Sequence, residues 1–219
     1  MSSQLSDVLT ALYSAIDRYE SVVLTALERN DVGELESLLR TQGMLREQPS
    51  LSESAPIFIE ARTTVWRAQS GSMRWERTTW HDDIIVGHEA GIRTTMGSWI
   101  REAEGHAFEE VDGQYDVGVA VLVDPAPILG FMRIDSIEES AMLGRPTYHV
   151  RGRPSHSPIP HALSLGPGVV DRYVFDVDRE RGVLLSLILK ARGVELQAML
   201  TEEVSFDAPL PGDTFTPPT

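Results

Sequence analysis

The sequence predicts an α+β protein in which an antiparallel sheet is covered by helices. In the first forty residues, apolar residues recur at steps of three and four, which is the spacing of an amphipathic helix. From Ile57 onward the pattern changes to short runs rich in Val, Ile, Thr and Trp. Gly, Pro or charged clusters interrupt these runs about every ten residues, which is typical of an antiparallel meander.

The N-terminal segment, residues 1–45, is expected to hold two helices. The apolar stripe of the first comprises Leu5, Val8, Leu9, Leu12, Ile16, Tyr19, Val22, Val23 and Leu27. A second, shorter helix is expected after Asp31, because this residue can cap a helix and Glu34 follows three residues later. Its apolar face would consist of Leu35, Leu38 and Leu39. The first stripe is too apolar to face water, so we expect this helix to pack on the sheet.

The strands are expected within residues 57–206. Their predicted ranges are 57–68, 72–81, 83–89, 92–102, 131–140, 145–154, 170–178, 183–190 and 194–206. A short mid-chain helix is expected near 124–131, because Asp124 can act as its N-cap and Pro125 suits its first turn. Residues 153–168 predict a long exposed loop and 207–219 an irregular tail. We expect residues 1–219 to form a single domain.

Two segments allow the sheet faces to be predicted. The turn "QSGS" at 69–72 is typical of a two-residue hairpin loop, and counting outward from it places Trp66 opposite Trp75 on one face. In the last strand one face is expected to hold Val194, Leu196, Ala198, Leu200, Val204 and Phe206. The run 183–190 is apolar on both sides, as in the middle of a covered sheet or beside a cavity.

Charge and composition exclude several classes of function. Lys and Arg total 19 against 33 for Asp and Glu, so the net charge is −14 and polyphosphates are repelled at long range. We therefore expect no nucleic-acid partner. The chain has no cysteine, which removes disulfides, thiolate metal sites and a lipidated cysteine anchor. The N-terminus does not resemble a signal peptide and no apolar run is long enough to span a membrane, so a cytoplasmic protein is expected.

No motif supports an enzymatic function. The nucleophile elbow and the P-loop are absent, and "GPGVVD" at 166–171 lacks the third glycine of a dinucleotide fingerprint. His156 and His161 lie in the long loop without the spacing of a metal site. The alternating carboxylates of 176–180 lack the glycine of a calcium loop, since that position is Arg181. We expect no catalytic residues, no metal and no cofactor.

The aromatic residues indicate where an apolar ligand would bind. Trp66, Trp75, Trp80 and Trp99 all fall in the first set of strands, where ordinary core packing and the lining of a ligand site are both open interpretations. The candidate ligand-binding residues are Phe58, Trp66, Met73, Trp75, Leu185 and Leu187.

Three segments resemble a known family. They are "DPAPILGFM" at 124–132, "GRPTYHVRGRP" at 144–154 and "DRYVFDVDRERGVLLSLILKARGVELQAMLTEEVSF" at 171–206. With the order of elements, they resemble the bacterial lipoprotein-carrier fold. That fold is shared by periplasmic lipoprotein carriers and receptors, mycobacterial lipid-binding lipoproteins and the sensor domain of anti-sigma regulators.

The resemblance implies a strongly bent antiparallel sheet, a half-barrel, covered by an N-terminal helix and a short mid-chain helix. In that family the concave face is apolar and holds acyl chains or the lipid of a partner, and no catalytic residues are involved. The missing signal peptide and anchor cysteine depart from the family pattern. What is expected to carry over is the fold, together with a capacity to hold an apolar ligand.

Three functions remain open. The first is non-enzymatic binding of a lipid-like or other apolar small molecule in a half-barrel cavity. The second is a protein-interaction or regulatory module whose half-barrel is filled by its own side chains, and the third is an enzyme acting on a hydrophobic small molecule. The volume of the cavity separates the first two, and a convergent cluster of titratable groups in it would favour the third.

Overall fold

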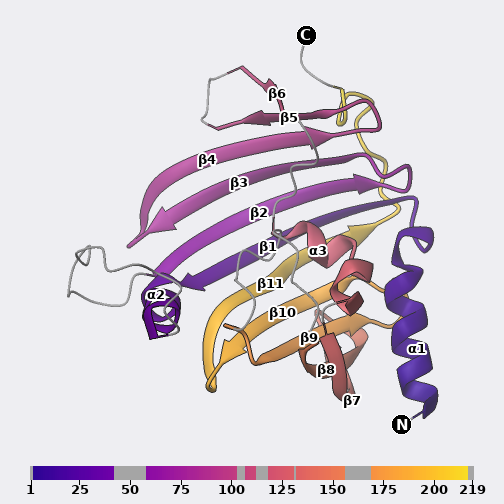
Figure 1. The fold of residues 1–219 in the computed structure, drawn as a ribbon. Helices are drawn as coiled ribbons and strands as arrows, with labels where there is room; N and C mark the ends of the chain where they lie inside the picture. Colours follow the sequence, from indigo (N-terminus) through magenta and orange to yellow (C-terminus); the bar gives the residue numbers. More distant parts are fainter. Residues whose placement is uncertain are drawn as a thin grey trace.

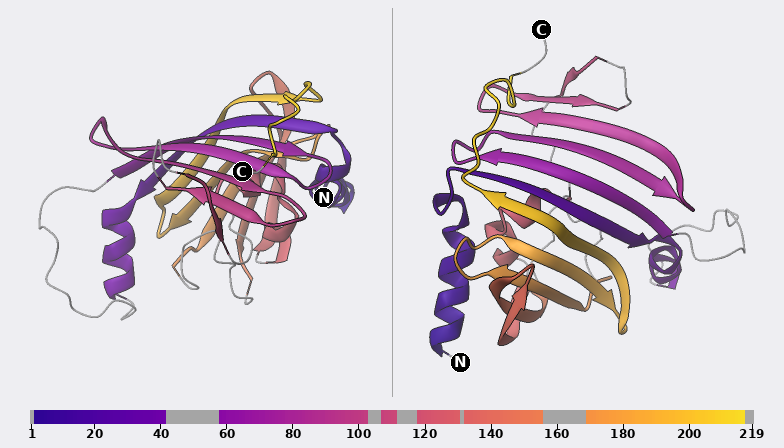
Figure 2. Two further views of the ribbon diagram at one scale, coloured as in Figure 1. Left: turned by 90° about the horizontal axis from the view of Figure 1, so that it is seen from above. Right: turned by 180° about the vertical axis from the view of Figure 1, so that it is seen from behind.

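One antiparallel sheet dominates the computed structural model, which describes residues 2–41, 58–102, 107–111, 118–130, 132–155 and 169–216. Within these residues the sheet has 11 strands in the order β6-β5-β4-β3-β2-β1-β11-β10-β9-β8-β7 (Figure 1). The sheet is curved and its two ends do not join (Figure 2). The predicted fold class, α+β with a strongly bent half-barrel sheet, is confirmed.

The elements have the following bounds. The strands are β1 (Ser21–Asp31), β2 (Phe58–Ala68), β3 (Met73–His81), β4 (Ile84–Arg93), β5 (Ser98–Arg101), β6 (Glu109–Val111), β7 (Met132–Met142), β8 (Arg145–Pro154), β9 (Arg172–Asp178), β10 (Leu184–Ala191) and β11 (Val194–Phe206). The helices are α1 (Ser2–Tyr13), α2 (Val32–Thr41) and α3 (Ala120–Val123), with 3-10 turns η1 (Ala15–Asp17) and η2 (Ala126–Gly130).

The largest difference from the sequence prediction is β1. The predicted first helix ends at Tyr13, and Ser21–Asp31 is a strand that pairs with both β2 and β11 at the centre of the sheet. Val22, Leu24 and Ala26 are fully buried, so burial alternates with a period of two. The apolar run of β1 fits both the helical and the strand period. Its hydrogen-bonded pairing with β2 and β11 favours the strand.

The hairpin between β2 and β3 also differs from its predicted register. The amide of Ala68 donates to the carbonyl of Ser72 at 3.0 Å, and Gly71 has a φ of 89°, which makes a three-residue loop. Trp66 therefore lies opposite Arg74, and Trp75 lies opposite Val65. The predicted register is off by one residue, so the predicted Trp66–Trp75 pair is wrong. The two indoles lie on opposite faces of the sheet.

The boundaries in the next hairpin differ as well. Residues 84–93 form one strand, β4, and the chain turns at 94–97 rather than near residue 90 as the sequence suggested. The short edge strand β6 was not predicted. Both differences arise in a region where Gly, Thr and charged residues give a weak turn signal.

Register shifts bend the sheet. They occur between Thr25 and Ala26 in the β1–β11 pair, and at four further places in the pairs β10–β11, β9–β10, β3–β4 and β7–β8. Each shift inserts an extra residue, which increases the local twist and curvature. The predicted single parity of β11 is therefore wrong, because Thr201 and Val204 face the same side as Ala26 and Leu24, their partners in β1.

The helices cover one face and two ends of the sheet. Figure 2 shows α3 on the concave side, with α1 and α2 at opposite ends of the strands. In α1, Val8, Ala11 and Leu12 are buried, and the helix contacts β9. The second helix, α2, starts after Asp31, whose Oδ1 accepts a hydrogen bond from the amide of Glu34 at 2.8 Å, as the capping pattern indicates.

The short helix predicted near 124–131 corresponds to the 3-10 turn η2, and the separate helix α3 precedes the predicted range. Asp124 does not start a helix: it is the C-cap of α3, and η2 follows Pro125. Its carboxylate is thereby free to reach the sheet.

Candidate functional site: the concave face of the sheet

The concave face is the sheet face toward α3, and the strand register defines its residues. They include Val22, Leu24, Ala26 and Glu28 of β1, Ala61, Thr63, Val65 and Arg67 of β2, Met73, Trp75 and Arg77 of β3, Glu89 and Gly91 of β4, Tyr173, Phe175 and Val177 of β9, Leu187 and Leu189 of β10, and Gln197, Met199, Thr201, Val204 and Phe206 of β11. Most of the apolar members have no solvent-exposed surface. This face therefore forms the main core.

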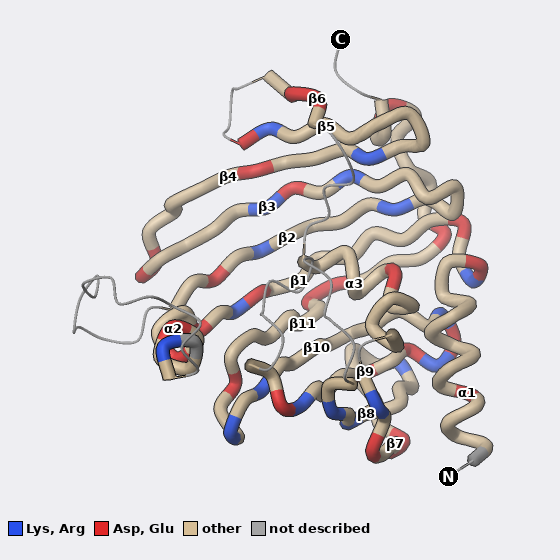
Figure 3. The backbone as a smooth tube through the Cα atoms, viewed as in Figure 1, with Lys and Arg blue, Asp and Glu red and all other residues tan. Residues whose placement is uncertain are grey.

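A charged network crosses the concave face on neighbouring strands. Glu28 accepts hydrogen bonds from the hydroxyl of Thr63 at 3.0 Å and from Nη2 of Arg77 at 3.3 Å. The Nη1 atom of Arg77 also donates to Glu89 at 3.2 Å. Charged residues are interspersed along β2, β3 and β4 (Figure 3). The buried member of this network is Glu28, and its pairing with the partly exposed Arg77 offsets part of the cost of burying a carboxylate.

Burial controls the acidity of Glu28. Its side chain is only 3% exposed, and the loss of hydration raises the pKa of this carboxyl above its ordinary value. Arg77 and Thr63 act in the opposite direction, and Glu89 adds to the rise. Since the cost of burial exceeds the stabilisation by Arg77, Glu28 binds a proton more readily in the folded chain than in the unfolded chain.

A second arginine on this face joins β2 to α3. The Nη2 atom of Arg67 lies 3.0 Å from Oδ2 of Asp124, and the arginine side chain is 6% exposed. Next to this pair, the hydroxyl of Tyr19 donates to the carbonyl of Val123 at 2.8 Å. Burial raises the pKa of Tyr19 to about 12, so the phenol is neutral. These contacts fix the end of α3 against the sheet.

Several buried polar atoms of the concave face have no hydrogen-bond partner. Within the described part of the chain they are Arg67 Nε and Nη1, Arg77 Nε, Tyr173 Oη, Gln197 Oε1 and Thr201 Oγ1. Burial also raises the pKa of Tyr173 to about 12. More than nine in ten buried polar groups of native proteins are paired. A face with this many unpaired atoms is therefore suited to a ligand or ordered water.

The six predicted ligand-binding residues fall into three groups. Met73, Trp75 and Leu187 share the concave face and are fully buried. Leu185 is fully buried at the register shift of the β9–β10 pair. Trp66 lies on the opposite face and Phe58, half exposed, at the start of β2, so neither joins the others. Sequence reasoning missed Arg67 and Glu28, whose positions depend on the true register and on β1.

The convex face carries the other three tryptophans. The strand register places Trp66, Trp80 and Trp99 on the side of the sheet opposite to Trp75. The guanidinium of Arg74 lies 5.7 Å from the Trp66 ring and that of Arg62 lies 5.9 Å from the Trp80 ring. Trp75 is thus the only tryptophan of this chain on the concave face.

Three hollows among the described residues are lined by both polar and apolar side chains. A hollow of about 200 Å³ is lined by Trp75, Glu89, Ala90, Ile100, Arg101 and Glu102. One of about 380 Å³ lies along β2, β3, β4 and β5 and includes Arg62, Trp80 and His88. A groove of about 590 Å³ separates α1 from β8 and the turn after β9, where Tyr148 and Arg179 line it.

A serine, an aspartate and a histidine meet on the convex face of β8, β9 and β10. Ser186 Oγ donates to Asp176 Oδ2 at 2.6 Å, and Nδ1 of His149 lies 3.0 Å from Asp176 Oδ1. In a hydrolase triad the histidine stands between the other two, because it must take the proton of the serine. Here the aspartate is in the middle, so the arrangement does not activate Ser186.

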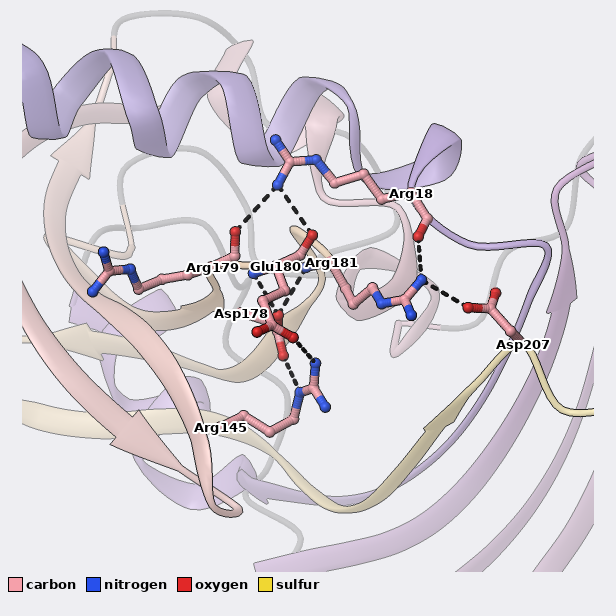
Figure 4. Close-up of polar contacts among 7 residues, drawn as sticks. All are labelled: Arg18, Arg145, Asp178, Arg179, Glu180, Arg181 and Asp207. Carbon is pink, nitrogen blue, oxygen red and sulfur yellow. Dashed lines mark hydrogen bonds and ion pairs between the residues drawn. The ribbon is translucent and has the colours of Figure 1, made fainter.

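A polar cluster fastens α1 to the turn between β9 and β10 (Figure 4). Asp178 is fully buried and accepts hydrogen bonds from the amides of Glu180 and Arg181, at 2.9 Å and 2.8 Å, and from Arg145. Arg18, beyond the end of α1, donates to the carbonyls of Arg179 and Glu180, each at 3.2 Å. The charged turn, to which sequence reasoning assigned no function, thus holds the N-terminal helix against the sheet.

The same cluster reaches the end of the last strand. Arg181 pairs with Asp207 at 2.8 Å, and Asp207 accepts a hydrogen bond from the amide of Glu20 at 2.7 Å. The guanidiniums of Arg145 and Arg181 lie 5.0 Å and 5.2 Å from the ring of Phe206. The start of β1 and the end of β11 are therefore tied together.

The described residues include no group of three or more His, Cys, Asp or Glu side chains that could hold a metal ion. His156 and His161 lie outside the residues that the structure describes. In the same part of the chain, no helix has the length and apolar character needed to span a bilayer.

Neither a family model nor a curated protein sequence matches this chain. Solved structures do. MucB matches over 98% of this chain with a TM-score of 0.53 and 16% identity. The MucA/MucB complex of Pseudomonas aeruginosa gives a TM-score of 0.53 and 17% identity over 97% of the chain. An uncharacterized conserved protein from Thermus thermophilus matches with a TM-score of 0.53 and 11% identity. That match covers 99% of this chain and 94% of the Thermus chain.

These matches establish the fold, which is the lipoprotein-carrier-like fold that the sequence resemblance indicated. The chain spans 62% of the length of MucB in one of these structures and 60% in the other. The expectation of a cytoplasmic location is contradicted, because MucB, whose fold this chain shares, is a periplasmic protein.

Proposed function

We propose that this protein is a non-enzymatic binding protein that holds a lipid-like molecule, with an apolar body and a polar end, against the concave face of its half-barrel. The observation that carries the proposal is the set of unpaired polar atoms on that face, Tyr173 Oη, Gln197 Oε1 and Thr201 Oγ1 among them. They stand beside the buried Leu187, Leu189 and Met199. An amphiphilic ligand would satisfy both kinds of group.

The expected affinity is modest. Each methylene group that leaves water contributes about 0.8 kcal/mol, so eight to ten of them give roughly 6 to 8 kcal/mol. Association costs offset part of this. Micromolar binding is therefore the most we expect for an unselected acyl chain.

The test is a titration with saturated fatty acids of increasing length, followed by tryptophan emission. We expect a saturable change whose midpoint falls as the chain lengthens, because each added methylene contributes a similar free energy. Acetate, which lacks the alkyl chain, is the control and should produce no change. A signal that does not saturate, or an affinity independent of chain length, would contradict the proposal.

A protein-interaction module is the second candidate. MucB has been solved in a complex with MucA. On the convex face of this chain, Arg74 stacks on Trp66 and Arg62 on Trp80, and Trp and Arg are the residues that most often dominate binding energy at protein interfaces. Failure of the fatty-acid titration would make this the better account.

A further inference from the structure

We propose that Arg67 is the anchor for an anionic carboxylate head group, so that the ligand class is the long-chain monocarboxylate. This inference rests on the proposed function and names the polar end of the ligand. Arg67 stands on β2 between Val22 of β1 and Met73 of β3, within the apolar part of the concave face.

The guanidinium of Arg67 is incompletely paired. Its Nη2 atom contacts Asp124, but Nε and Nη1 are buried and have no acceptor within the described part of the chain. The side chain is 6% exposed, whereas that of Asp124 is 33% exposed. Because arginine stays protonated and burial of an unpaired donor is unfavourable, this position favours a further oxygen acceptor.

The surroundings of Arg67 select an anion better than those of Arg77. Arg77 lies between two carboxylates, Glu28 and Glu89, which already balance its charge and would repel another anion. Arg67 has the single carboxylate of Asp124. The adjacent Tyr19 is neutral, since burial raises the pKa of its phenol to about 12, and its hydroxyl proton is committed to Val123.

The residues next to Arg67 suit an alkyl chain. Val22, Val65 and Met73 have no exposed surface, and Trp75 follows on the same face of β3. A carboxylate on Nε or Nη1 would thus place the attached chain along apolar side chains. Charge-assisted hydrogen bonds from arginine to carboxylate are among the stronger polar contacts.

The experiment compares decanoate, 1-decanol and acetate by calorimetric titration of the full chain. We expect wild type to bind decanoate on the order of tenfold more tightly than 1-decanol, and acetate not measurably. The Arg67→Met variant, matched in size, should bind both ten-carbon ligands equally. Asp124→Asn should bind decanoate more tightly than wild type, because it removes the competing carboxylate. Arg29→Met, which alters an exposed arginine paired with Glu60, should behave as wild type.

The outcomes separate the two proposals. If neither ten-carbon ligand binds wild type, the proposed function fails. If both bind wild type equally, or if Arg67→Met keeps the preference for decanoate while its melting curve shows a folded protein, the role of Arg67 is overturned. Acetate binding as tightly as decanoate would also overturn it, because the site would then take a free small anion. If Asp124→Asn binds decanoate more weakly than wild type, the role of Arg67 as the carboxylate anchor is contradicted. A purely structural Arg67–Asp124 contact would give this weaker binding when it is lost.

Discussion

The indole of Trp75 lies directly over Gly91 of the neighbouring strand. A Cβ atom on Gly91 would lie 1.9 Å from Cζ2 of the indole, which no side chain tolerates without movement. The glycine therefore makes room for the only concave-face tryptophan, and Trp75 is fully buried as a result.

Substituting Gly91→Ala should consequently displace the indole. We expect a loss of about 1 to 3 kcal/mol in the free energy of unfolding, as for overpacked cores, measured by urea denaturation. Gly87→Ala is the matched control, because it lies on the same strand and nothing stands within 4 Å of its added Cβ. Equal effects of both substitutions would show that the contact is unimportant.

Leu12→Asp should remove the cooperative unfolding transition. Leu12 is fully buried in α1, and an unpaired charge there costs several kcal/mol, on the order of a small domain's whole stability. Tyr13→Asp changes the next residue of the same helix, which is 64% exposed, and should leave the melting curve nearly unchanged. A cooperative transition in Leu12→Asp at the wild-type temperature would show that α1 is peripheral.

Asp178→Asn should loosen the attachment of α1. The carboxylate is fully buried and pairs with Arg145, so its neutralisation is expected to cost about 3 kcal/mol in chemical denaturation. Glu180→Gln changes the other carboxylate near Arg145, at 3.3 Å, whose side chain is 66% exposed. That control should cost less than about 0.5 kcal/mol. A reversed order of the two effects would refute the importance of the buried carboxylate.

Because Glu28 binds a proton more readily in the folded chain, its contribution to the free energy of unfolding should fall as the pH rises. Its pKa is raised in the folded state by burial, so between the ordinary pKa and the raised one the folded chain binds more protons than the unfolded chain. The stabilising contribution is present at low pH and is lost as the pH rises through the folded pKa. The free energy of unfolding of Glu28→Gln, minus that of wild type, should therefore increase as the pH rises through this window. Glu60→Gln, at an exposed position, is the control, and a flat difference for Glu28→Gln would contradict the assignment.

The sequence predicted the later strands well because their periods and turn residues are distinct. Gly144, Gly182 and Gly193 have positive φ values at or beside the turns after β7, β9 and β10, and those strands lie close to their predicted ranges. The N-terminal strand was missed because Val22 to Leu27 fits a helical stripe as well as a strand. Only its two neighbours in the sheet, β2 and β11, decide the outcome, and these are far away in the sequence.

Only the apolar part of the candidate site could be predicted from the sequence, because the face on which the other residues lie depends on the strand register. Met73, Trp75 and Leu187 could be proposed from apolar character alone, and they share the concave face. Trp66 was assigned to that face through a two-residue turn, and the three-residue turn moves it to the other. Arg67 and Glu28 carried no sequence signal, because a charged residue in a strand ordinarily faces water.

Heavy-atom quenching by a brominated fatty acid shows whether the ligand binds on the concave face. Bromine quenches an indole only at short range, and Trp75 is the only tryptophan on that face. A protein that retains Trp75 alone, with Phe at positions 66, 80 and 99, should lose most of its emission when dibromostearate saturates the site. A protein with Trp75→Phe alone should keep its emission. The opposite pattern, in which only the second protein is quenched, would place the ligand on the convex face and contradict the account.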